Sequence, residues 1–486
     1  LLDVEGDGDL DIYVVQGGSI HNPVQITATN QLFLNDGSGF FTNATKGSGA
    51  DDTGYGMGAT TGDYDNDGDL DIYVTNVGAN TLLRNNGDGT FSAVTNESGV
   101  GDDSWGSSSA FVDMDCDGDL DLYVVNYIEW NEGIERNCKS QSGILDYCHP
   151  DAYNAPAKDV LYRNNGDGTF TDVSKEAGIH SVWGNGLGVT VGDVNDDGLL
   201  DVFIANDEMN NQLWMNQGDG TFIDDALVSG VAFDENGEPK AGMGTDFADV
   251  DNDGFLDLIV VNLSGETDSM FMNKGGWFSD GTPGSGLSSI SRPYTRFGTG
   301  FRDLNNDGIL DLYMSNGKVR LPDTILTNDP YAEENVLIQG VGNGRFEEVF
   351  PKGGTASELV HTSRGIAYGD LNNDGWVDIV VINRDANAYL LMNQNSGGGG
   401  FIKLDLRNEH GAPAQDAVVR FTLGDQQIRR EVRTGGGYCS AHDPTLHIGL
   451  GSEKSISGVE VTWSDGSKQA IGDVNVSEVR TIHQGK

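Results

Sequence analysis

Seven short stretches of this chain place oxygen-bearing side chains at alternate positions, which is the spacing that a hard cation requires. In the third copy, Asp113, Asp115, Asp117 and Asp121 occupy positions one, three, five and nine, and Gly118 occupies position six. Oxygen ligands folded back by a glycine are typical of loops that coordinate Ca²⁺. Each stretch therefore predicts a calcium loop, with the carbonyl of position seven as a further ligand.

The seven copies vary little: position six is always Gly, and position three is always an oxygen donor. We expect about seven Ca²⁺ ions, one per copy, bound most weakly in the sixth and seventh loops, which have three acids each. The predicted ligands at positions one, three, five, seven and nine are Asp3, Glu5, Asp7, Asp9 and Asp11 in the first loop; Asp63, Asp65, Asp67, Asp69 and Asp71 in the second; Asp113, Asp115, Asp117, Asp119 and Asp121 in the third; Asp193, Asn195, Asp197, Leu199 and Asp201 in the fourth; Asp249, Asp251, Asp253, Phe255 and Asp257 in the fifth; Asp303, Asn305, Asp307, Ile309 and Asp311 in the sixth; and Asp370, Asn372, Asp374, Trp376 and Asp378 in the seventh.

Two other interpretations of these loops are less favoured. An EF-hand needs a bidentate Glu at position twelve and a helix on each side, whereas position twelve here is apolar and lies within a predicted strand, as at Val74 and Val124. Solvated Asp-Gly turns without metal are the second alternative. They are disfavoured because so many carboxylates in nine residues repel one another unless a cation offsets their charge.

Each loop leads into an apolar strand, and a second pair of strands follows, joined by a turn such as the Gly-Asp-Gly of Thr81–Phe91. Such units recur every 50–80 residues. Seven four-stranded units at this period predict an all-β fold, a seven-bladed β-propeller over residues 1–395. An open β-solenoid is the alternative, but its metal repeats recur far more closely.

The Asp-x-Asp-x-Asp-Gly-x-x-Asp motif within four-stranded repeats resembles the FG-GAP (or VCBS) repeats of integrin α-subunit propellers. The resemblance covers residues 1 to about 395. It implies one Ca²⁺ in each loop, as the ligand pattern itself indicates.

A Gly-rich break at Asn395–Gly400 separates a second domain, residues 396–486. Short apolar runs there predict a small β-sandwich with strands at Phe401–Leu406, Ala417–Leu423, Gln427–Val432, Thr445–Ile448, Val459–Trp463 and Val479–His483. The motifs Arg429–Val432, Gly435–Ser440, Leu446–Gly451 and Val459–Gly466 resemble the ASPIC/UnbV domain, although Trp-Ser-Asp-Gly replaces the more usual Trp-Pro-x-Gly. This domain follows FG-GAP repeats in the cartilage acidic protein family. The resemblance implies a secreted, calcium-binding and non-catalytic protein.

Charge and hydropathy exclude some partners. The net charge is −48, so the chain is not expected to bind nucleic acid or an anionic membrane surface. We find no apolar stretch long enough to span a membrane and no signal peptide. Because Leu1 falls inside a repeat, we expect upstream residues to complete the first unit and to close the ring against the seventh.

Four cysteines allow three pairings. We favour a disulfide between Cys138 and Cys148, which lie ten residues apart in one insertion, with Cys116 and Cys439 free.

Propeller geometry predicts that the metal loops share one face with the short turns, and that the opposite face carries the long insertions Tyr127–Asp159, Ile223–Met243 and Asn316–Glu334. We call this opposite face the insertion face and expect the partner there. Its candidate contacts are Trp105, Trp183, His149, Asp151 and Tyr153. The aromatic residues could instead pack between blades, and His149, Asp151 and Tyr153 could belong to a loop that is merely pinned by the disulfide.

No nucleophile elbow, zinc-protease motif or phosphate loop is present. The sequence therefore favours a non-enzymatic extracellular binding or adhesion module for a protein or glycan. A secreted polysaccharide lyase or hydrolase acting at the insertion face is one alternative. A subunit of a surface layer or filament is another.

Overall fold

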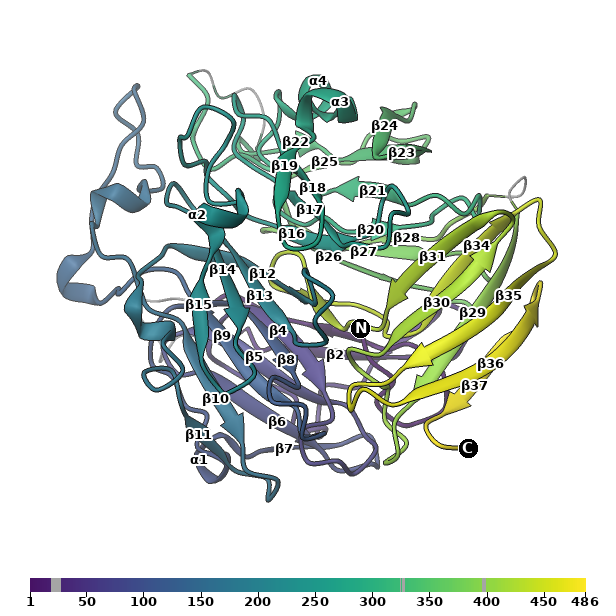
Figure 1. Ribbon diagram of the computed structural model, residues 1–486. Coiled ribbons are helices and arrows are strands. Elements are labelled where there is room, and N and C mark those ends of the chain that lie inside the picture. The colour runs from purple at the N-terminus through teal and green to yellow at the C-terminus, as the bar shows by residue number, and fades with distance from the viewer. Residues whose placement is uncertain (19–27, 324, 326–327, 396–398) are drawn as a thin grey trace.

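Loops two to seven each connect two antiparallel strands of one sheet, and loop one leads into a strand of another sheet, so the seven loops define seven successive sheets, which we number in chain order (Figure 1). The computed structural model describes residues 1–18, 28–323, 325, 328–395 and 399–486. Within these ranges the fold is all-β, as predicted, and the helices are short. None of the described helices is long and apolar enough to cross a membrane.

Sheets two to six have four strands each, ordered from the loop-bearing pair outward. They are β4 (Tyr55–Gly62), β5 (Asp71–Val77), β6 (Thr81–Asn85) and β7 (Phe91–Ala93); β8 (Gly106–Val112), β9 (Asp121–Asn126), β10 (Val160–Asn164) and β11 (Phe170–Asp172); β12 (Gly186–Gly192), β13 (Asp201–Asn206), β14 (Gln212–Asn216) and β15 (Phe222–Asp224); β16 (Thr245–Ala248), β17 (Asp257–Val260), β18 (Ser269–Asn273) and β19 (Phe278–Asp280); and β20 (Phe301–Arg302), β21 (Asp311–Met314), β23 (Val336–Gly342) and β24 (Arg345–Glu348).

Sheets one and seven have three strands each within the described residues. In sheet one the place of the first strand is taken by a single bridge between Leu2 and Asp11. These sheets contain β1 (Ile12–Val14), β2 (Gln31–Asn35) and β3 (Phe41–Asn43), and β26 (Ser363–Gly369), β27 (Asp378–Asn383) and β28 (Tyr389–Leu391). Outside the seven sheets, β22 (Glu333–Glu334) pairs with β25 (Val360–His361), and the α-helices are α1 (Thr95–Ser98), α2 (Ala226–Ser229), α3 (Thr282–Ser285) and α4 (Leu287–Ser291).

A separate apolar cluster joins each sheet to the next, which explains why strands such as β9 are buried along their whole length and have a continuous apolar centre rather than alternating apolar and polar residues. The seventh cluster joins sheet seven back to sheet one, so these two sheets pack directly on each other. Representative pairs are Leu32 and Ile72, Tyr73 and Leu122, Val125 and Val202, Phe203 and Leu258, Ile259 and Leu312, Tyr313 and Val381, and Val380 and Ile12.

The C-terminal domain has two sheets that enclose one apolar core. The six predicted strands are present, but a seventh strand, β36, was missed because most of its side chains are exposed and leave no apolar pattern. The predicted boundary falls partly on residues 396–398, which lie outside the described residues. The two sheets contain β34 (Leu446–Gly451), β29 (Gly400–Arg407) and β37 (Val479–His483), and β31 (Gln426–Glu431), β30 (Val418–Leu423), β35 (Ser455–Thr462) and β36 (Lys468–Asn475).

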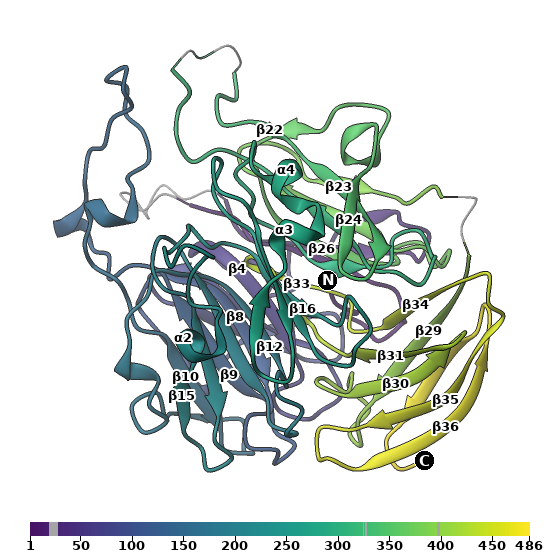
Figure 2. The same cartoon turned by 45° about the horizontal axis from the view of Figure 1, so that its top comes forward.

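A hairpin of this domain, formed by β32 (Gly435–Gly436) and β33 (Ser440–Ala441), inserts among the first strands of the repeat sheets (Figure 2). The hairpin and the residues that flank it bond to strands of five different sheets, so those strands surround the hairpin. The contacts are Thr434 with Thr61, Cys439 with Ser108, Tyr438 with Gly188, Gly437 with Thr245, and Asp443 with Tyr368.

The rest of the C-terminal domain lies against the metal loops. Lys403 Nζ lies 2.6 Å from Asp370 Oδ2 in loop seven, and Arg420 lies 2.7 Å from Asp196 in loop four. At loop six the approach is so close that a Cβ on Gly449 would come within 1.9 Å of Asp303 Oδ2. The domain therefore covers much of the face that carries the metal loops.

His447 of β34 makes this interface sensitive to pH. Its Nε2 lies 2.6 Å from Asn306 Oδ1 of loop six. Burial, together with the charge of Lys403, lowers the pKa of His447 from 6.5 to about 4, against a smaller opposing effect of Asp370. The unfolded chain is protonated below about 6.5 and the folded chain only near 4, so this contribution to stability is present above pH 6.5 and is lost as the pH falls towards 4.

Replacing His447 by Gln should remove that loss. Between pH 6.5 and about pH 5, we expect the free energy of unfolding of the unaltered chain to fall by about 2 kcal/mol more than that of the variant. Denaturant titrations at the two pH values measure the difference. His410→Gln, which replaces an exposed histidine outside the contact with loop six, serves as the control variant. Equal losses in the unaltered chain and in His447→Gln would contradict this prediction.

Candidate metal loops and the opposite face

In the third loop, backbone N–H groups hold the carboxylates of positions one and nine in place. Asp113 accepts hydrogen bonds from the backbone N–H groups of Asp117 and Gly118 at 3.1 and 3.2 Å, which fold the loop back on itself. Asp121, at position nine, accepts from Met114 N–H at 3.2 Å and from Asn164 N–H in β10 at 2.7 Å. The first and ninth carboxylates are therefore held by the backbone, and their oxygens keep further lone pairs for a cation.

Two positions of each loop require a left-handed backbone. Gly118 at position six has φ +93°, which explains the invariant Gly. Position four is also left-handed, with φ +59° at both Asn66 and Cys116. Sequence analysis missed this second constraint. The enrichment of Asn and Asp at position four was its visible signal, because these residues tolerate positive φ.

The predicted ligands converge in several loops. In loops two, three and five, three carboxylates each offer an oxygen within 4.8 Å of one another. Asp65 Oδ1 of loop two is buried and has no hydrogen-bond partner. An all-oxygen donor set with an unpartnered buried carboxylate oxygen fits Ca²⁺. The three groups are Asp63, Asp65 and Asp71; Asp113, Asp115 and Asp117; and Asp249, Asp251 and Asp257.

Burial is the main reason why the loop carboxyls have raised pKa values. It raises the pKa of Asp63 to about 7 and that of Asp113 to about 6, with smaller contributions from neighbouring carboxylates. At position nine it raises the pKa of Asp121 and of Asp257 to about 8. Near neutral pH, the position-nine carboxyls retain their protons unless a positive charge stabilises the ionised form, whereas Asp113 is mostly ionised. Protons and cations therefore compete most strongly at position nine.

The residue at position seven is predicted to bind the cation through its backbone carbonyl. Its side chain, in some loops, forms a hydrogen bond to a neighbouring loop. Asp119 Oδ1 accepts a hydrogen bond at 2.6 Å from Asn66 Nδ2 of the preceding loop. Asp9 Oδ1 accepts one at 2.8 Å from Asn373 Nδ2, which links loop seven to loop one. These side chains connect neighbouring loops.

An asparagine that ends the third strand joins adjacent sheets, and sequence analysis did not identify it. Asn164 Nδ2 donates to the carbonyls of Leu120 in its own loop and of Tyr64 in the preceding loop, at 3.0 and 2.7 Å. The sequence feature that could have indicated this role is the Asn that precedes the Gly-rich turn in most of the repeats. Equivalent pairs of bonds are made by Asn35, Asn85, Asn216, Asn273 and Asn393.

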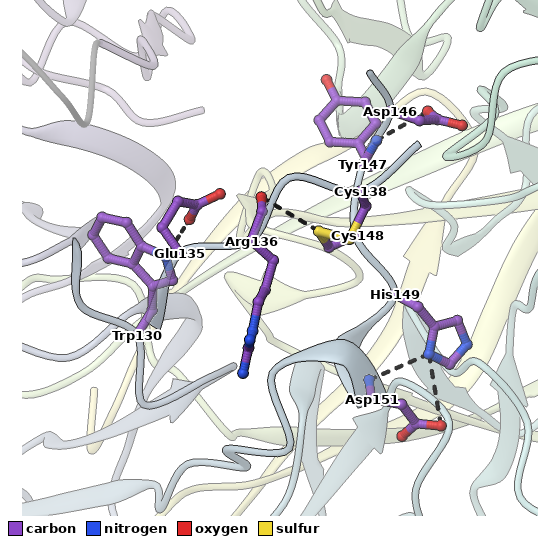
Figure 3. The surroundings of a disulfide bond; sticks show 9 residues. All are labelled: Trp130, Glu135, Arg136, Cys138, Asp146, Tyr147, Cys148, His149 and Asp151. Carbon is purple, nitrogen blue, oxygen red and sulfur yellow. Dashed lines mark hydrogen bonds and ion pairs between the residues drawn. A yellow bond between two sulfur atoms is a disulfide. The ribbon is translucent and has the colours of Figure 1, made fainter. Parts of the chain in front are cut away.

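On the insertion face, a disulfide joins Cys138 and Cys148 (Figure 3). The loop that it closes reaches across to sheets six and seven. Asp146 accepts a hydrogen bond from Tyr331 Oη at 2.8 Å, and Tyr147 Oη contacts the guanidinium of Arg384. Cys116 and Cys439 are free thiols.

The predicted contact residues of this face separate into two groups. His149 and Asp151 come together with Glu208, and His149 Nε2 pairs with that glutamate. Tyr153 interacts instead with Glu135.

The two tryptophans also differ. Trp105 packs edge-on against Tyr127 and Trp130, with ring centroids 5.4 and 6.3 Å away; both of these residues lie in the insertion that follows β9 of the same sheet. Trp183 is 48% exposed and has the ammonium of Lys158 4.1 Å from its ring centroid. Trp183 is therefore the more exposed of the two tryptophans.

Comparison with known proteins identifies the repeats. The family described as FG-GAP-like repeat matches residues 3–74, 63–124, 148–204, 193–260 and 249–314, which together make up more than half of the chain. The chain belongs to the FG-GAP-like repeat family. Residues 407–486 match the family described as ASPIC and UnbV, which confirms the resemblance found for the C-terminal domain.

Curated relatives are cartilage acidic proteins. The protein from Homo sapiens is 29% identical over 316 residues, 64% of this chain and 45% of its own length. The protein from Mus musculus is 28% identical over 315 residues, 64% of this chain and 46% of its own length. The chain thus spans about half the length of these relatives.

Solved structures with some likeness include an Agrocybe aegerita lectin that recognises non-reducing terminal N-acetylglucosamine. Its TM-score is 0.43 at 16% identity, over 81% of this chain and 93% of the lectin. A rhamnogalacturonan lyase from Bacillus licheniformis has a TM-score of 0.32 at 13% identity, over 70% of this chain and 72% of the lyase.

Replacing Asn164 by Ala should separate sheets two and three. The change leaves the buried carbonyls of Tyr64 and Leu120 without their donor, so we expect a loss of about 2 kcal/mol in the free energy of unfolding. Its neighbour Asn165 is exposed and bonds to Thr169, so Asn165→Ala provides the matched control and should change stability little. Urea denaturation compares the two variants, and equal effects would argue against the inter-sheet role.

Proposed function

We propose that this chain is a calcium-stabilised, seven-bladed β-propeller of the extracellular space whose insertion face binds a protein or glycan partner. The observation that carries the proposal is the position of the C-terminal domain. It covers metal loops with Lys403 and Arg420 and fills the axis with Thr434–Asp443. The face that remains open is the opposite one, where the long insertions lie.

The packing of the sheets supports the propeller. The apolar clusters run from sheet one through sheet seven and back to sheet one, with a final link through Leu371 and Ile12. A hydrogen bond at 2.7 Å from Asn35 Nδ2 to the carbonyl of Leu371 crosses the same junction. A cycle of seven sheets, with the first strands around a filled axis, is the arrangement of seven blades.

The donor chemistry supports calcium. Residues at positions one, three, five and nine, with the carbonyl of position seven, would hold the ion in each loop. Bound Ca²⁺ supplies the positive charge that the buried carboxylates otherwise lack. The protein's own contribution is to hold those carboxylates in place through backbone N–H groups, as Asp117 and Gly118 do for Asp113.

The disulfide between Cys138 and Cys148 supports an extracellular location, because such bonds persist in oxidising compartments. The names of the curated relatives point in the same direction. A binding role without catalysis is proposed because the insertion face offers an exposed aromatic side chain, Trp183, on a disulfide-braced surface, which suits recognition.

Removing calcium should destabilise the repeats. A site filled at 100 times its dissociation constant stabilises the fold by about 2.7 kcal/mol, so excess chelator should lower Tm and added Ca²⁺ should restore it. Replacing Asp65 by Ala should reduce the calcium-dependent rise in Tm. Asp88→Ala, which removes an exposed acid of a Gly-Asp-Gly turn, should not. If chelator leaves Tm unchanged, the proposed calcium role is wrong.

The partner should map to the insertion face. We expect that a screen of glycans and extracellular-matrix proteins, run with Ca²⁺, yields a ligand whose affinity falls about tenfold or more in Trp183→Ala. Trp277, which is 59% exposed and lies in a turn between β18 and β19, provides the control, because Trp277→Ala should bind normally. A loss confined to Trp277→Ala would place the partner elsewhere, and turnover of a polysaccharide in the screen would favour the enzyme alternative.

A further inference from the structure

Three of the seven loops offer the same predicted ligands: an aspartate at positions one, five and nine, an asparagine at position three, and a backbone carbonyl at position seven. Any difference in their metal affinity must therefore come from their surroundings. These are loop four, with Asp193, Asn195, Asp197, Leu199 and Asp201; loop six, with Asp303, Asn305, Asp307, Ile309 and Asp311; and loop seven, with Asp370, Asn372, Asp374, Trp376 and Asp378.

Loop seven is distinguished by an ammonium group from the C-terminal domain. Lys403 Nζ of β29 lies 2.6 Å from Asp370 Oδ2, an oxygen that also accepts a hydrogen bond from Gly375 N–H at 2.8 Å. The side chains of Lys403 and Asp370 are only 11% and 1% exposed. Phe401 packs so closely on the same loop that a Cβ on Gly375 would meet its ring at 2.0 Å. The ion pair is therefore mostly shielded from bulk solvent, although both residues also line a cavity of about 90 Å³.

Among the described residues, no ion pair joins a cation to the position-one carboxylate of either matched loop. In loop four, Arg420 pairs with Asp196 at position four, where the side chains are 38% and 51% exposed. The buried Arg429 reaches position one only at the backbone carbonyl of Asp193, at 3.3 Å, and its charge is paired with Glu431. In loop six, Gly449 presents its backbone to Asp303, and Arg430 acts on Asp303 electrostatically without an ion pair.

Loop five also has a lysine, but in a different setting. Lys274 pairs with Asp253 at position five and has a side chain that is 50% exposed. An exposed lysine of the same sheet can turn away when a metal arrives.

We propose that Lys403 is the resident cation of loop seven, and that this loop is consequently the last of the seven to accept a metal ion. The inference rests on the calcium binding proposed above. A fixed positive charge on Asp370 both neutralises that carboxylate and repels an incoming cation, and the repulsion is strong because little water screens it. Lys403 thereby ties the C-terminal domain to the repeats without calcium at that point.

Loop seven carries its own reporter, because Trp376 stands at position seven. Tb³⁺ binds to oxygen sites of the calcium type and emits when a neighbouring indole is excited, so this emission measures the filling of loop seven. Trp277 follows Gly276, which lies against Asn195 of loop four, so the titration uses the full chain in a Trp277→Phe background. Total bound Tb³⁺ is measured in parallel by equilibrium dialysis.

With Lys403 present, indole-sensitised emission should rise only after most of the Tb³⁺ has bound. Lys403→Met should move the midpoint to at least about tenfold lower free Tb³⁺, because the repelling charge is gone. Lys403→Arg keeps the charge and should leave the midpoint near its original value. An unchanged midpoint in Lys403→Met would overturn the proposal.

A second comparison leaves Lys403 in place and remains informative if its variants do not fold. Replacing Trp376 by Leu and Leu199 by Trp moves the reporter to loop four, which has the same ligands without the buried ammonium. We expect loop four to fill at about tenfold or more lower Tb³⁺ than loop seven. Equal midpoints in the two loops would overturn the proposal. Absence of bound Tb³⁺ and of emission in every variant would instead refute the calcium binding on which it rests.

Discussion

The carboxylate at position nine of each loop is the interaction on which the repeat architecture depends. Asp121 receives one backbone N–H from Met114, at the start of its own loop, and another from Asn164, at the end of the third strand. The side chain of Asn164 then reaches the carbonyl of Tyr64 in the preceding loop. One buried carboxylate thus holds the start of its loop to the end of the third strand. Through Asn164, the same strand end is bonded to the neighbouring sheet. Sheet six keeps the first two links through Asp311 but has Gly340 in place of the asparagine.

These buried carboxylates also create a charge problem. Burial raises the pKa of Asp121 to about 8, so the ionised form needs a positive charge nearby. Basic side chains of the C-terminal domain supply such a charge to some loops, as Lys403 does to Asp370, and the calcium ions that we propose would supply it in the others. The basic side chains of the C-terminal domain approach each loop differently. Loops with the same predicted ligand residues therefore have different electrostatic surroundings.

The position of the C-terminal domain decides which surface is open. Its hairpin lies among the first strands of the repeat sheets, and its sheets lie on the Asp-rich loops, so these loops form an internal interface. Among the described residues, the insertions on the other face have no such cover. There the disulfide and the contact of Asp146 with Tyr331 hold the longest insertion against the insertion of sheet six.

The sequence by itself determined the number of loops, the four-strand unit, the all-β class, the second domain and the pairing of Cys138 with Cys148. It did so because ligand spacing, turn residues and apolar periodicity are local properties of the chain. It did not reveal Asn164 as a link between sheets, the position of the hairpin around Tyr438 among the first strands, or Lys403 as the partner of Asp370. Those roles depend on contacts between residues far apart in the chain, such as Tyr438 and Gly188, which only the tertiary structure brings together.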